Sequence, residues 1–166
     1  MKNNDSWKAD QDTILLMQNC IAKWHPSLAL VDKQIAVVMR AKAAKSGGFP
    51  VLGTARKAPP ILSVLTDGDY EFVLEIAADE WQTLSNDQRE ALMDHLLCSC
   101  KVEEEEGTGE VKCSITKPDV FFFYDELKRH GDWRPRRQEE EGPSIDVEAR
   151  ILGDDVSSAT AADGAE

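Results

Sequence analysis

ALMDHLLCSC, residues 91–100, is the stretch of sequence that decides both the fold and the site. It lies in a helix that the sequence predicts from Ser85 to about Lys101. Ser85 is a favourable N-cap, and Gln88 three residues later completes a capping box, in which each side chain bonds the other residue's backbone N–H. We therefore place one well-defined helix here.

This helix carries part of the zinc-binding motif His-Glu-x-x-His. In that motif the two histidines stand one turn apart and bind zinc, while the glutamate polarises the attacking water. Here His95 is present, but Leu96 stands at the glutamate position and Ser99 at the second histidine position. Leucine cannot accept a proton and a serine hydroxyl is a poor zinc ligand. We therefore expect no catalytic residues and read His95 as vestigial.

Segments on both sides of the helix share a family pattern. Together they resemble the putative phage metallopeptidase family over roughly residues 14–133. The segments that carry the resemblance are Trp24-His25-Pro26-Ser27-Leu28, residues 48–57 (GFPVLGTARK), 69–81 (DYEFVLEIAADEW), 84–95 (LSNDQREALMDH) and 118–133 (PDVFFFYDELKRHGDW).

The resemblance implies a compact zincin, similar in style to the SprT-like proteases. It also implies a further metal ligand, a histidine or glutamate just ahead of the retained phenylalanine in the segment from Pro118 to Phe123. This chain has Phe121 and Phe122 there, so that ligand too is expected to be lost.

A chain of 166 residues suits one domain with a sizeable core. We assign residues 1–138 to that domain. Residues 139–166 are acidic and lack aromatic side chains, which predicts a disordered tail. No apolar run approaches a membrane helix and the start is no signal peptide, so we expect no membrane association and a cytoplasmic location.

The net charge of −12 is unevenly distributed. Residues 1–60 have an excess of basic side chains, whereas residues 61–127 carry seventeen acidic against four basic ones. Such an acidic segment is usually a solvated face, but spaced carboxylates can also imitate the phosphates of DNA. An acidic DNA mimic therefore remains an alternative.

The remaining pattern predicts an α+β fold in which helices pack on a small twisted sheet. We expect a helix over residues 12–24 capped near Asp10 or Asp12, and the first strand within 29–41. A further strand is expected over 70–76, an irregular segment over 51–65, a short return strand over 111–115, and a last helix that begins at Pro118 and ends before Gly131.

Four cysteines leave a second metal possibility open. Cys98 and Cys113, with His95, are suitable ligands for a rebuilt zinc site, which would make the chain a peptidase or other hydrolase. Buried free cysteine is the commoner outcome. We expect reduced thiols, no metal and no cofactor, and keep the rebuilt site as the alternative.

Aromatic residues gather before the last helix. Phe123 and Leu127 are expected in the core. Phe121, Phe122 and Tyr124 either fill the space that a metal once occupied or line an open groove and bind a partner, since aromatic side chains are frequent binding hot spots.

Arginines near the end of the domain raise the question of nucleic-acid binding. The basic residues near Trp133 are Arg129, Arg134, Arg136 and Arg137, a combination that suits phosphates and bases, but the acidic run from Glu139 opposes it. We therefore expect no direct nucleic-acid binding. The leading hypothesis is an inactive, phage-encoded metallopeptidase-like protein that binds a bacterial host protein as an accessory or anti-defence factor.

Overall fold

The fold is built on one mixed four-stranded sheet, in the order β1 (Ser6–Lys8), β2 (Ile35–Arg40), β6 (Phe72–Ala77) and β5 (Gly53–Lys57). The computed structural model describes residues 5–118 and 123–135. Strands β2 and β6 run parallel with Ile35 opposite Phe72, and the two outer strands are antiparallel to their neighbours. The α+β class predicted from sequence is confirmed.

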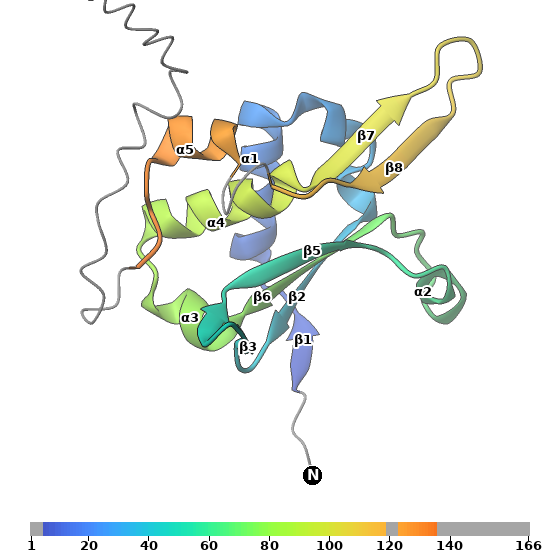
Figure 1. Cartoon of the computed structure of the whole chain (residues 1–166). Helices are drawn as coiled ribbons and strands as arrows, with labels where there is room; N and C mark the ends of the chain where they lie inside the picture. Colours follow the sequence, from blue (N-terminus) through green and yellow to red (C-terminus); the bar gives the residue numbers. More distant parts are fainter. Residues whose placement is uncertain (1–4, 119–122, 136–166) are drawn as a thin grey trace, which may run out of the picture.

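Helices α1 (Gln11–Trp24) and α4 (Asn86–Cys98) pack over the sheet, and α5 (Tyr124–His130) packs on α4 (Figure 1). Alternate residues of β2 are buried, as expected for a strand with one face against helices. Strand β6, between β2 and β5, is buried at every residue except Glu75. The helices and the sheet share one apolar core, which includes Met17, Cys20, Phe72, Leu74, Met93 and Leu97.

Shorter elements complete the chain. They are two short 3-10 helices (Pro26–Leu30 and Asp32–Gln34), helices α2 (Ile61–Leu65) and α3 (Ala78–Thr83), and two hairpins: β3 (Ala44–Ser46) with β4 (Phe49–Val51), and β7 (Cys100–Glu104) with β8 (Val111–Ile115). The β7–β8 hairpin projects from the body of the protein (Figure 1). None of the described helices is long and apolar enough to cross a membrane.

Local signals predicted several elements well. Asp10 caps α1 by accepting a hydrogen bond from the Thr13 N–H, and Ser85 and Gln88 form the predicted capping box of α4. The strands expected over 70–76 and 111–115 are confirmed as β6 and β8. Gly131 ends α5 with a φ of 64°, a conformation that favours glycine.

Three predictions were wrong. The segment 51–65 is not irregular, because it holds β5 and α2; β5 forms by pairing with β6, although its sequence GTARK has little strand propensity of its own. The strand expected within 29–41 is present as β2, but it is not the first, because β1 precedes it as an edge strand paired with β2. The last helix begins at Tyr124 rather than Pro118, because the Phe123 N–H bonds the Glu126 side chain at that point.

Two predictions concern residues outside the described ranges. The tail at 139–166 lies there, and so do Phe121 and Phe122. The zincin-like architecture and the domain boundary at residue 138 remain predictions.

Candidate functional site

Helix α4 presents consecutive side chains to different parts of the molecule. Asp94 is buried toward α1 and α5, His95 contacts α5 and the rim of a cleft, and Leu96 packs on the sheet. This follows from the 100° rotation per residue of an α-helix. One short run of α4 therefore serves three separate environments.

The His95 ring is held by a buried carboxylate. His95 Nδ1 lies 2.6 Å from Glu126 Oε2, and Glu126 on α5 has no solvent exposure. Glu126 also accepts hydrogen bonds from Trp133 Nε1 at 2.7 Å and from the Phe123 backbone N–H at 3.1 Å. The Phe123 ring packs 5.4 Å from the imidazole, centroid to centroid. These contacts fix the orientation of His95.

A cleft of about 650 Å³ lies beside His95. The β3–β4 hairpin and the start of β5 form one wall, and helix α4 with the segment after α5 forms the other. Its lining is Ser46, Phe49, Pro50, Val51, Leu52, Gly53, Glu80, Thr83, Leu92, His95, Trp133, Arg134 and Pro135. Most of the large side chains in this lining are apolar, so the cleft suits apolar groups of a ligand.

Leu96 lies apart from the cleft lining. It is 1% exposed, and a Cβ added at Gly53 of β5 would stand 3.1 Å from its Cδ1 atom. Ser99 is the C-cap of α4, where its backbone N–H bonds the Leu96 carbonyl at 3.2 Å. The two positions that differ from the zinc motif therefore serve packing and helix termination.

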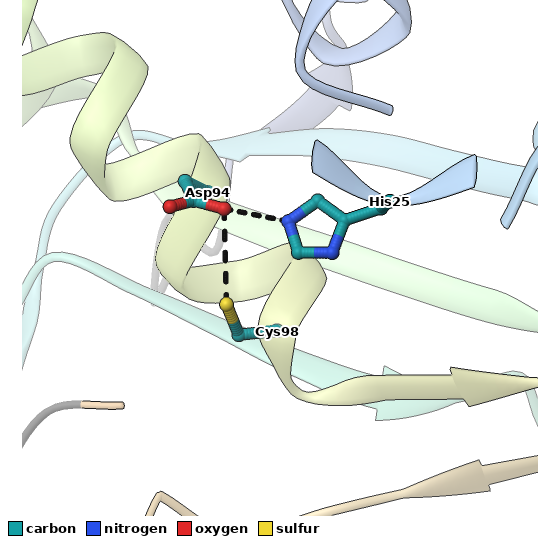
Figure 2. A group of neighbouring side chains, drawn as sticks. All are labelled: His25, Asp94 and Cys98. Carbon is teal, nitrogen blue, oxygen red and sulfur yellow. Dashed lines mark hydrogen bonds and ion pairs between the residues drawn. The ribbon is translucent and has the colours of Figure 1, made fainter. Parts of the chain in front are cut away.

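Asp94 organises a second cluster on a different side of α4. Its Oδ1 lies 2.5 Å from His25 Nε2, and its Oδ2 lies 2.8 Å from Arg129 Nη1 and 3.1 Å from His130 Nε2. Cys98, one turn further along α4, places its Sγ 3.7 Å from Oδ1. Figure 2 shows His25 and Cys98 directed at the same carboxylate oxygen.

The electrostatics of this cluster favour a charged Asp94. Burial raises the pKa of the carboxyl, but the hydrogen bond from His25 and the positive charge of Arg129 outweigh that effect and hold the pKa below its usual value. Because an ionised carboxylate only accepts hydrogen bonds, His25 Nε2 and His130 Nε2 donate to it. Trp24 covers the cluster, with its ring 5.0 Å from that of His130 and 5.4 Å from the Arg129 guanidinium carbon.

The structure separates the three residues of the alternative rebuilt site. His95 bonds Glu126, whereas Cys98 lies with His25 and Asp94. Cys113 lies on β8 opposite Val102, where burial and the nearby Glu71 carboxylate raise the pKa of its thiol. Among the described residues, the group that brings potential metal ligands together is His25, Asp94 and Cys98.

The other residues singled out from sequence are placed as follows. Phe123 and Leu127 are buried, as predicted, and Tyr124 is 43% exposed at the start of α5. Sequence reasoning missed Asp94 and Glu126 as site residues. The available signal was that Asp94 precedes His95 and stands one helical turn before Cys98.

Comparison with known proteins agrees with the sequence resemblance. No curated protein and no solved structure gives a significant match. The model of one family, described as putative phage metallopeptidase, matches residues 5–142 and so covers most of the chain, including every element of the cleft and of the Asp94 cluster. The chain therefore belongs to the putative phage metallopeptidase family.

Proposed function

We propose that this chain is a metallopeptidase-family protein that no longer hydrolyses peptides and instead binds a protein partner in the cleft beside His95. The observation that carries the proposal is the burial of Leu96 against β5 at Gly53. A hydrolytic zinc site needs a base at this position, and the position is occupied by an apolar side chain that is part of the core.

The described residues around His95 do not fit the zinc that the family implies. A catalytic zinc has three protein ligands and an open position. Here His95 is paired with Glu126, and the position one turn further along the helix is Ser99, which caps it. One imidazole and a buried carboxylate already bonded to it do not make such a ligand set.

The cleft itself has the properties of a binding site. Its volume of about 650 Å³ is in the usual range for ligand pockets and would accept a few side chains of a partner. Phe49 at its rim is 54% exposed, and Trp133 forms part of its wall while remaining buried. Aromatic groups in a concave site are typical binding hot spots. Phe121, Phe122 and Tyr124 stay candidate partner-binding residues on the basis of the sequence; Phe121 and Phe122 lie outside the described residues.

The kind of partner follows from the family. A phage-encoded member acts inside a bacterial host, so the proposed partner is a host protein and the proposed role is that of an accessory or anti-defence factor. An exposed apolar side chain of the partner would enter the cleft and contact Phe49.

The test compares two variants of exposed apolar residues. Phe49→Asp places a charge in the cleft, and Leu30→Asp makes the same kind of change at a 58% exposed residue that does not line the cleft. We expect a host protein to co-purify with the wild type and with Leu30→Asp, but not with Phe49→Asp. The recovered host protein should be uncleaved. Zinc-dependent cleavage that is lost in His95→Ala would overturn the proposal in favour of a hydrolase.

The acidic β7–β8 hairpin supports a second candidate function. Glu103, Glu104, Glu105 and Glu106 are all exposed on this projecting hairpin (Figure 1). Spaced carboxylates can bind an electropositive protein as DNA would. Binding through the hairpin should weaken strongly with added salt and survive Phe49→Asp, whereas binding through the apolar cleft should resist salt.

A further inference from the structure

His25, Asp94 and Cys98 form a cluster that takes no part in the proposed partner binding. Ligand atoms from these three side chains lie within 4.8 Å of one another. We propose that they bind a divalent transition-metal ion, with zinc as the best match, on a side of α4 away from the cleft. This inference is independent of the proposed partner binding, since none of the three residues lines the cleft.

The spacing of the donors suits an ion after a small adjustment. Asp94 and Cys98 are four residues apart on α4, so they share one helical face, and His25 reaches the same point from the end of α1. The distance from Asp94 Oδ1 to Cys98 Sγ is 3.7 Å and to His25 Nε2 is 2.5 Å. Ligands roughly 2.0–2.3 Å from a tetrahedral zinc stand about 3–4 Å apart. His25 would therefore move away from Oδ1 by about 1 Å.

The donor types select the ion. Imidazole nitrogen, carboxylate oxygen and thiolate sulfur together suit zinc, whereas magnesium and calcium prefer oxygen ligands alone. Three protein donors leave a fourth position for water.

The surroundings of Asp94 match those of a ligating carboxylate. Arg129 and His130 bond Oδ2, which leaves Oδ1 directed at His25 and Cys98. Carboxylates that bind metals are commonly held in this way by outer hydrogen bonds. The positive charge of Arg129 opposes a bound cation. However, Arg129 Nη1 contacts Asp94 Oδ2 rather than Oδ1, and it lies 3.9 Å from Cys98 Sγ, where it would stabilise a thiolate.

Charge and protons balance on binding. The ion replaces the proton on His25 Nε2, so that the neutral ring carries its proton on Nδ1, and it displaces the thiol proton of Cys98, which passes to solvent. The carboxylate and the thiolate then offset the two positive charges of the ion. A bound ion would link the end of α1 to α4.

The experiment uses the full chain, refolded with and without cobalt(II) or zinc so that a buried site can load. Cobalt reports thiolate ligation directly by its sulfur-to-metal absorption. The decisive variant is Cys98→Ala, which removes a ligand but leaves the bonds of Asp94 to His25 and Arg129. Cys20→Ala is the matched control, because Cys20 is also a free thiol and faces α4 from α1.

We expect about one ion per chain in the wild type, in Cys20→Ala, in Cys113→Ala and in His95→Ala. Cys98→Ala should lose the thiolate absorption and bind at least tenfold more weakly. A metal-free wild type after refolding with either ion would overturn the proposal. So would binding that survives Cys98→Ala, or binding lost on changing His95 or Cys113, which would place the metal in the alternative rebuilt site.

Discussion

Leu96 of α4 and Gly53 of β5 are packed so closely that a single added methyl group at Gly53 would stand 3.1 Å from Leu96 Cδ1. This contact joins the helix that bears His95 to the edge strand of the sheet. The residue at the place of the catalytic base is therefore part of the core, and both positions are expected to be sensitive to substitution.

Leu96→Glu should be strongly destabilising. The change restores the carboxylate of the zinc motif but buries a charge against the sheet with no metal to offset it, a cost of several kcal/mol. Urea denaturation measures the loss, with Leu30→Glu at an exposed position as the control. An unchanged unfolding midpoint for Leu96→Glu would show instead that this side of the helix is open to water.

Gly53→Ala should lower the free energy of unfolding by about 1–3 kcal/mol, as overpacking does. The new Cβ would meet the Glu75 carbonyl oxygen at 3.0 Å as well as Leu96, and a backbone atom moves less readily than a side chain. The control is Gly68→Ala, where the nearest atom is 3.4 Å away. Equal stability of the two variants would contradict the close packing of α4 on β5.

Asp94→Asn should destabilise the fold by about 3–5 kcal/mol at neutral pH, because it leaves the partly buried Arg129 without its carboxylate. The folded-state pKa of Asp94 is lowered, so its stabilisation is present above the unfolded pKa of about 3.9 and is lost as the pH falls through the lower folded value. Urea titrations at pH 7 and near pH 3 should therefore show a smaller difference between wild type and variant in acid.

The matched control for Asp94→Asn is Glu103→Gln. Glu103 pairs with Lys101 on the exposed β7–β8 hairpin, where solvent screens the interaction, so little change in stability is expected at either pH. A similar loss in both variants would mean that the Asp94 cluster contributes no more than a surface ion pair.

Thiol reactivity should separate the four cysteines of the metal-free protein. Burial raises the pKa of Cys20 and of Cys100 to about 12, and it also raises that of Cys98. Because the thiolate is the nucleophile, these three should react slowly with an alkylating reagent at pH 8. The pKa of Cys113 is also raised, but this thiol is the least deeply buried of the four and should react first. Mass spectrometry of partly alkylated native protein identifies the order, and all four should react at similar rates in urea.

Local signals in the sequence predicted the parts of the fold that depend on neighbouring residues. The capping box at Ser85 and Gln88 and the cap at Asp10 were read correctly, because the groups involved are three residues apart. Strand β5 was missed because its stability comes from pairing with β6, which follows it in the chain by about fifteen residues. Tertiary pairing had overridden a weak local preference.

The site was predictable only in part for the same reason. The changes at Leu96 and Ser99 could be read from the motif, since its spacing is local. The bond between His25 and Asp94 joins residues 69 positions apart, and that between His95 and Glu126 joins residues 31 apart. Neither pair has a sequence signature, so the cluster around Asp94 and the carboxylate behind His95 emerged only from the folded chain.

Asp94, Leu96 and Ser99 have separate structural roles on α4, and this separation affects how such a protein can change in evolution. The contacts of Asp94 fasten three helices together, and they involve neither residue 96 nor residue 99. A change at residue 96 or 99 therefore removes none of the Asp94 contacts, although residue 96 must stay apolar to pack on β5. A lineage could in this way change the residues of a reaction site, keep the folded scaffold throughout, and leave the cleft beside it free to acquire a different task.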